Sequence, residues 1–193
     1  MYGTGVPKLW NETIEGHRRE VRDAILDAVG SLVVAHGLTS VTMSSVADTA
    51  GIGRATLYKY FPDIQAVLVA WHERQVADHL GHLSQVGTGA SGPLERLRAV
   101  LEAYAAMSSQ HSGSELAGFL HRGEHVSRAR QQLIEFVRDL LLEAARAGVI
   151  RTDVAADELA RYCLHALGAA HELPTPGALG RLVTVTLTGL QET

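Results

Sequence analysis

Histidines are the first residues here whose type and spacing could support chemistry, and the chain has ten of them. His121, Glu124 and His125 match the pattern H-x-x-E-H, which on a helix places two imidazoles on one face with a carboxylate beside them and can bind zinc. Gly118 and Gly123 weaken a helix there, and no distant glutamate stands out as a third ligand. We therefore expect no metal, no cofactor and no catalytic residue. A metal-dependent hydrolase stays as an alternative hypothesis.

A second pattern, in residues 42–61, suits binding rather than catalysis. The segment TMSSVADTAGIGRATLYKYF reads as two short helices around a tight turn. Val46, Ala47 and Ala50 give the first helix an apolar face. Gly51 supplies the left-handed residue that the turn needs, and Ile52 fills the angle between the helices.

The second of these helices buries Leu57 and Phe61 and leaves an unusual set of side chains facing outward. The set combines cations, a hydroxyl, a small residue and an aromatic with a polar tip: Arg54, Ala55, Thr56, Tyr58 and Lys59. Such a face suits a helix that lies in the major groove of DNA. The pattern therefore predicts a recognition helix.

These residues resemble the helix-turn-helix of the TetR/AcrR family of bacterial transcriptional regulators. The shared pattern is an apolar-Ala pair, then Ala-Gly-Val/Ile, then Thr-Leu-Tyr-x-Tyr-Phe, carried here by residues 46–47, 50–52 and 56–61. The resemblance extends over residues 14–70. It implies a cytoplasmic homodimer that binds a palindromic DNA operator, responds to an apolar small-molecule effector and acts as a repressor. A DNA-binding dimer without an effector is the other alternative.

Eleven residues are expected to contact DNA, from the resemblance and from the exposed face: Arg18, Arg19, Thr42, Ser44, Gly53, Arg54, Ala55, Thr56, Tyr58, Lys59 and Tyr60. Ser44 or Ser45, and Ile64, stand where family members often carry Arg and Lys. Residues 1–62 hold six cations and six anions, so their net charge is zero. Phosphate affinity must then come from local placement, such as the cluster of Arg18, Arg19 and Arg22.

The elements that would position these residues are all helices, because apolar residues recur at helical spacing and the five prolines leave long uninterrupted stretches. Residues 182–188 alternate with a period of two, as strands do, but a lone strand would have no partner, so we predict a helix there as well. The expected helices are about 14–36 (or from Arg18), 42–51, 53–61, 63–86, 93–110, 114–122, 126–147, 155–172 and 176–191, with a flexible connector over 87–92.

Two domains follow, an N-terminal arm with a three-helix DNA-binding domain over 1–62 and a larger helical domain over 63–193. The resemblance assigns effector binding and dimerisation to the second domain. Candidate pocket residues are large and mostly aromatic: Trp71, Tyr104, Met107, Phe119 and Phe136. Candidate dimer-interface residues come from the last two helices: Leu159, Tyr162, Ala166, Leu182 and Leu190.

Composition excludes several other classes of protein. The net charge is −4, too acidic for a protein coated in nucleic acid but compatible with a small basic patch. Cys163 is the single cysteine, so it forms no intramolecular disulfide, and its apolar neighbours at helical spacing predict a core position. No apolar run reaches the ~18 residues of a membrane span, and the N-terminus lacks a hydrophobic signal core. We expect a soluble protein of a reducing compartment.

Overall fold

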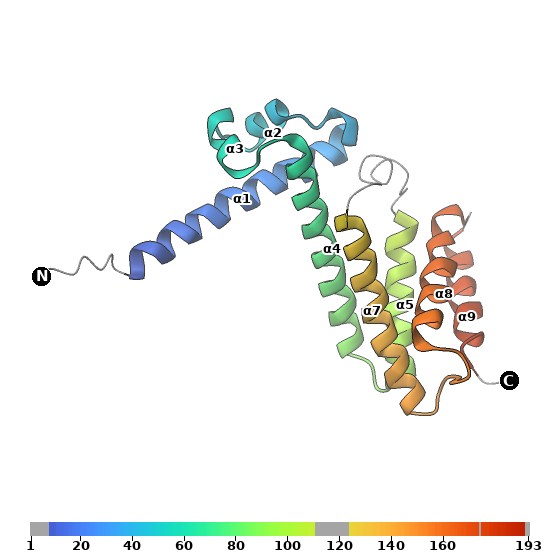
Figure 1. The fold of residues 1–193 in the computed structure, drawn as a ribbon. Coiled ribbons are helices and arrows are strands. Elements are labelled where there is room, and N and C mark those ends of the chain that lie inside the picture. The colour runs from blue at the N-terminus through green and yellow to red at the C-terminus, as the bar shows by residue number, and fades with distance from the viewer. Residues whose placement is uncertain (1–7, 111–123, 174, 192–193) are drawn as a thin grey trace, which may run out of the picture. The chain divides into compact units, whose positions relative to one another are not determined.

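The computed structural model describes residues 8–110, 124–173 and 175–191, and within these ranges every regular element is a helix (Figure 1). The predicted all-α fold is thereby confirmed. None of the helices so described combines the length and the hydropathy needed to cross a lipid bilayer. The expected helix at 114–122 lies outside the described residues.

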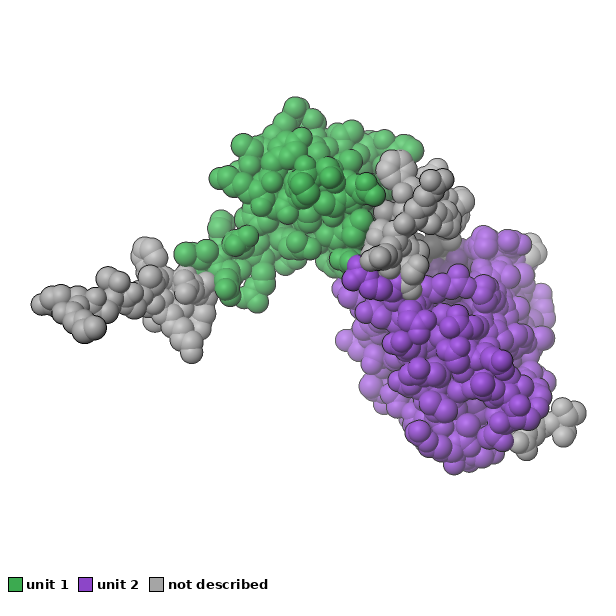
Figure 2. Space-filling view, viewed as in Figure 1, with its two compact units in different colours: residues 1–74 green, residues 75–193 purple. Residues whose placement is uncertain are grey.

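The chain divides into two compact units, residues 1–74 and 75–193 (Figure 2). Unit 1 holds α1 (Lys8–His36), the short 3-10 helix η1 (Leu38–Ser40), α2 (Met43–Thr49), α3 (Arg54–Tyr60) and the first part of α4 (Ile64–Thr88). The division thus falls inside α4 rather than after residue 62. The reason is that the first turns of α4 pack with unit 1: Val67 and Leu68 are buried, and Nη2 of Arg74 donates to Oδ1 of Asp27 on α1 at 2.7 Å.

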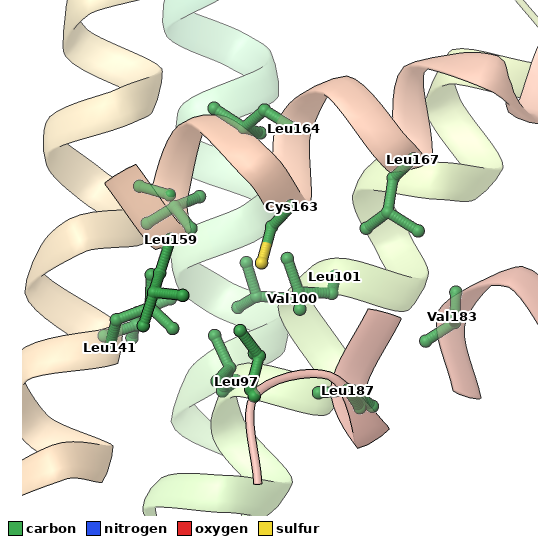
Figure 3. Close-up of a cluster of buried hydrophobic side chains, with 14 of the residues drawn as sticks. Leu97, Val100, Leu101, Leu141, Leu159, Cys163, Leu164, Leu167, Val183 and Leu187 are labelled. Carbon is green, nitrogen blue, oxygen red and sulfur yellow. The ribbon is translucent and has the colours of Figure 1, made fainter. Parts of the chain in front are cut away.

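Unit 2 contains the rest of α4, then α5 (Pro93–Gln110), α7 (Glu124–Arg146), α8 (Ala156–Gly168), the 3-10 helix η2 (Ala169–Glu172) and α9 (Pro176–Thr188). Helix α5 contacts α7, α8 and α9, and apolar side chains from all four form one core. Figure 3 shows Cys163 of α8 pointing among Val100, Leu101 and Leu159. The thiol is fully buried, as predicted, and loss of solvent raises its pKa to about 12.

Several helix boundaries differ from those expected, and α9, for example, ends at Thr188 rather than at 191. Helix α1 begins at Lys8, upstream of Ile14, and α8 ends at Gly168 before passing into η2. Helix α4 continues through Thr88, although a flexible connector was expected from residue 87. Gly87 serves close packing there, because a Cβ at this position would lie 3.3 Å from Cγ of Arg96 on α5.

Helix α9 covers the segment whose apolar residues alternate with a period of two, so the prediction of a helix is confirmed. Its threonines tolerate the helix because each hydroxyl donates to the carbonyl four residues earlier: Thr184 to Gly180, Thr186 to Leu182 and Thr188 to Thr184, all at 2.9 Å. Thr186 is fully buried, and this bond satisfies its hydroxyl.

Candidate nucleic-acid interface and pocket

The turn between α2 and α3 is fixed by a capped helix and one glycine. Thr42 caps α2: its Oγ1 accepts from the Ser45 amide at 3.1 Å, while Oγ of Ser45 accepts from the Thr42 amide at 2.9 Å. Gly51 has φ +67, and nothing lies within 4 Å of a Cβ built there. The backbone conformation alone, rather than a lack of space, therefore requires glycine at this turn.

Helix α3 has one buried and one exposed side, as the sequence predicted. Leu57 and Phe61 are buried with 0% and 3% of their surface exposed, whereas Tyr58 exposes 55%. The remaining residues expected to contact DNA in this segment are exposed, except for three that are half-buried: exposed are Thr42, Gly53, Arg54, Ala55 and Lys59, and half-buried are Ser44, Thr56 and Tyr60. The two short helices therefore present polar and cationic groups on a continuous stretch of chain.

The arginines of α1 do not all behave alike. Arg18 and Arg19 are exposed, and none of the ion pairs among the described residues involves them. Arg22 instead places its guanidinium 5.0 Å from the centre of the Phe61 ring, within cation–π range. Arg22 thus helps to hold the end of α3 against α1, a role that the expected phosphate-binding cluster did not anticipate.

Unit 2 contains a cavity of about 340 Å³ between α5, α7 and α8. Its lining is part apolar and part basic: Tyr104, Arg130, Leu133, Ile134, Arg161, Leu164, His165 and Gly168. The volume is at the lower end of the range for small-molecule sites. Most of this lining was not predicted from the sequence, because the candidate pocket residues were large and mostly aromatic. The mouth of the cavity is instead formed by arginines on two different helices.

Of the residues predicted to line a pocket, Tyr104 lines this one. Met107 and Phe136 pack against the core of unit 2 instead. Trp71 lies in unit 1, where a Cβ at Gly30 would meet its Nε1 at 3.4 Å, so it packs on α1. Phe119 is outside the described residues.

The outer faces of α8 and α9 carry the residues expected at a dimer interface, with two corrections. Leu159 and Leu190 expose only 6% and 0% of their surface and belong to the core of their own chain, so neither can reach a partner. Tyr162 exposes 45%, and Val185, which the sequence reasoning overlooked, exposes 65%. Ala166 and Leu182 are half-buried.

The H-x-x-E-H segment falls where little is described. His121 lies outside the described residues, and Glu124 and His125 stand in the first turn of α7, where the structure describes the backbone alone. Among the side chains that are described, no group of three or more His, Cys, Asp or Glu residues could hold a metal ion. The hydrolase hypothesis has no support from the fold.

Comparison with known proteins identifies both halves of the chain. The family model described as bacterial regulatory proteins of the tetR family matches residues 25–71, and the model described as the C-terminal domain of SbtR-like transcriptional regulators matches residues 93–192. The HTH-type transcriptional regulator Rv2250c of Mycobacterium tuberculosis, itself uncharacterised, is 28% identical over 144 residues, which cover 72% of this chain and 75% of that protein.

Solved structures share the fold at low identity. A TetR/AcrR regulator from Thermobifida fusca superposes with a TM-score of 0.71 at 18% identity, over 90% of this chain and 100% of that one. A protein of unknown function from Rhodococcus sp. RHA1 gives 0.75 at 21% identity, over 89% and 96%. One family model falls within each unit, and the second alone spans more than half of the chain; the chain belongs to the TetR family of bacterial transcriptional regulators.

Proposed function

We propose that this protein is a ligand-responsive homodimer that binds a palindromic operator in the cytoplasm and represses transcription. The observation that carries the proposal is the two-sidedness of α3, whose buried Leu57 anchors a helix that exposes Arg54, Tyr58 and Lys59. A helix with this division can enter the major groove while its apolar side stays in the domain.

Within α3, position along the helix suggests different tasks for different side chains. Arg54 and Thr56 lie near the N-terminus, the part of a recognition helix that meets base edges. Tyr58 and Lys59 come later and suit contacts to phosphate, the first through its hydroxyl and the second through its charge. Arg18 and Arg19 of α1, exposed and outside the described ion pairs, would add phosphate contacts.

Dimerisation is needed because one α3 reads only half of a site, too little for useful specificity. Tyr162 of α8 and Val185 of α9 are large apolar side chains left exposed on unit 2. A Cβ at Gly189 would lie 3.2 Å from Oη of Tyr162, so the tyrosine leans over the end of α9 and the two helices share one face. We infer that this face meets its copy about a two-fold axis.

The cavity in unit 2 supports an effector of small size. Several structures of similar fold are, by their own descriptions, regulators linked to small organic molecules: a ketosteroid regulator of Mycobacterium tuberculosis, RolR bound to resorcinol, and FadR of Bacillus subtilis bound to stearoyl-CoA. An effector bound in unit 2 would release DNA only through its differential affinity for the two states of the dimer.

Selection of DNA fragments by the purified full-length protein tests the proposal, followed by footprinting of the enriched sequence. We expect an inverted repeat whose half-sites are one helical repeat apart, about 34–36 Å, or a multiple of it. Enrichment of a single half-site, or binding that shows no sequence preference, would contradict the dimeric operator-binding function.

A further inference from the structure

The cavity between α5, α7 and α8 has a chemical character that narrows the class of effector. We propose that it binds a small amphipathic organic anion, whose acidic head group is held by Arg130 and Arg161 and whose apolar part rests on Leu133, Ile134 and Leu164. This inference rests on the proposed function, because it specifies the ligand of that regulator.

The floor of the cavity is apolar and well covered. Ile134 and Leu164 expose only 2% and 8% of their surface, and Leu133 is half-buried beside them. Tyr104 closes one side, with its hydroxyl 3.5 Å from the carbonyl oxygen of Leu164. A hydrocarbon chain or a ring would displace water from this floor, which favours binding in proportion to the apolar area covered.

The mouth of the cavity brings cations from two helices together. Arg161 and His165 stand four residues apart on α8 and so share a face, and Arg130 reaches them from α7. Among the residues that the structure describes, none of those lining the cavity is a carboxylate. Arginine presents several N–H donors in a planar fork, which suits a carboxylate or a phosphate head group.

The charge of Arg130 is not balanced by a carboxylate, because its partner is an imidazole. Its Nη2 lies 2.6 Å from Nε2 of His165, and because a guanidinium has no acceptor, the arginine can only be the donor in this contact. Five of the other described arginines, by contrast, pair with a carboxylate: Arg74, Arg96, Arg138, Arg151 and Arg161. An imidazole carries no negative charge, so His165 orients Arg130 without compensating its charge, which leaves that charge for a ligand.

Arg161 can contribute as well, although it has an acidic partner. It donates from Nε to Oδ2 of Asp157 at 2.9 Å on the same helix, and this bond does not use its terminal nitrogens. The pair is about half-exposed, so water screens the attraction. The head-group site consequently has one uncompensated arginine and one arginine that is only partly neutralised.

Calorimetric titration of the full-length protein with three matched probes tests this assignment: octanoate, octyl phosphate and the neutral octanamide. We expect octanoate or octyl phosphate to bind about tenfold or more tightly than octanamide, because hydrogen bonds to charged groups contribute more than neutral ones. The tighter of the two anions identifies the head group as carboxylate or phosphate.

Variants locate the site. R130Q and R161Q should each weaken binding of the preferred anion by about tenfold, whereas R146Q, a matched change of an exposed arginine on α7 outside the cavity, should leave it unchanged. All three positions are exposed, so the substitutions should have little effect on stability. Unchanged melting, and unchanged operator affinity in the absence of ligand, would show that each variant folds.

Three results would overturn the inference: no binding of either anion at ~1 mM, equal affinity for octanamide, or equal loss in R146Q and R130Q. Operator release by a neutral compound, with no effect of the anions, would leave the proposed function standing and refute the anion site alone. Anion binding that depends on Arg130, with no compound releasing the operator, would keep the site and refute the ligand response.

Discussion

The side chains of α3 divide by what they can reach once Leu57 and Phe61 are buried in unit 1. Arg54 is the first residue of the helix and follows Gly53, an N-cap that has no side chain. Lys59 lies in the last turn. The two cations of this helix therefore stand at opposite ends, and a mutation in each separates base reading from phosphate anchoring.

Replacing Arg54 by Ala should relax the preferred sequence at one position in each half-site and weaken binding to the best site by ~1–3 kcal/mol. Replacing Lys59 by Ala should weaken all sequences alike and reduce the slope of log K against log salt by about one per monomer. Site selection and salt titrations with both variants measure the difference. An unchanged motif for R54A together with a changed motif for K59A would reverse the two assignments.

Cys163 shows what burial does to a titratable group in the core of unit 2. Because desolvation raises the pKa of its thiol from 9.0 to about 12, the reactive thiolate is almost absent at neutral pH. Thiol reagents should label the folded protein at a rate limited by unfolding, and label it rapidly in denaturant. The unfolded thiol ionises first as pH rises, so its contribution to stability is present below pH 9 and is lost between about 9 and 12. Rapid labelling of the native protein at pH 7 would contradict this.

Helices α8 and α9 show what could not be predicted from the sequence: which of their apolar residues face outward. Apolar spacing predicted both helices, but it could not tell which apolar residues of a helix face its own chain and which face outward. Leu190, two residues past the end of α9, is fully buried, whereas Val185 within α9 is 65% exposed, although both are apolar. Only the packing of α9 against α5 and α8 separates them.

The double substitution Tyr162→Glu and Val185→Glu should convert the dimer to monomers, because two charges per chain would be desolvated at the contact. Monomers should bind operator DNA weakly, since each carries one recognition helix. Light scattering at micromolar concentration measures the state, and Val34→Glu, at an apolar residue of α1 with 90% of its surface exposed, is the matched control. A wild-type protein that is monomeric, or a double variant that remains dimeric, would contradict the proposed interface formed by α8 and α9.

The helix-turn-helix and the pocket differ in how far sequence predicts them. The turn is local: Thr42, Gly51 and Leu57 act within twenty residues of chain, each through a backbone or burial requirement that its type reveals. The pocket depends on a contact between Arg130 and His165, which are distant in sequence. Both are polar, so the periodicity of apolar residues does not reveal them. Local geometry was predictable for this reason, and the ligand site was not.

At the scale of the whole molecule, the proposed ligand response requires that a ligand in unit 2 change DNA binding by unit 1. Helix α4 runs through both units, since the division falls between Arg74 and Gln75 within Ile64–Thr88. Its first turns belong to unit 1 through the Arg74–Asp27 ion pair and buried Val67. A stiff helix can transmit a displacement from one unit to the other, and a softened one transmits less.

Two glycines just past the division, A77G and D78G, should soften α4 at exposed positions, at a cost of ~1 kcal/mol each in helix stability. We expect the double variant to bind operator and ligand separately as the wild type does, but to lose most of the ligand's effect on operator affinity. Operator titrations with and without the preferred anion give this coupling free energy, and by linkage the reverse titration must give the same value. The matched control is R98G with E102G, at two exposed positions of α5. Since these glycines leave α4 intact, equal loss of coupling in the control, or full coupling in the α4 variant, would mean that the signal does not travel through α4.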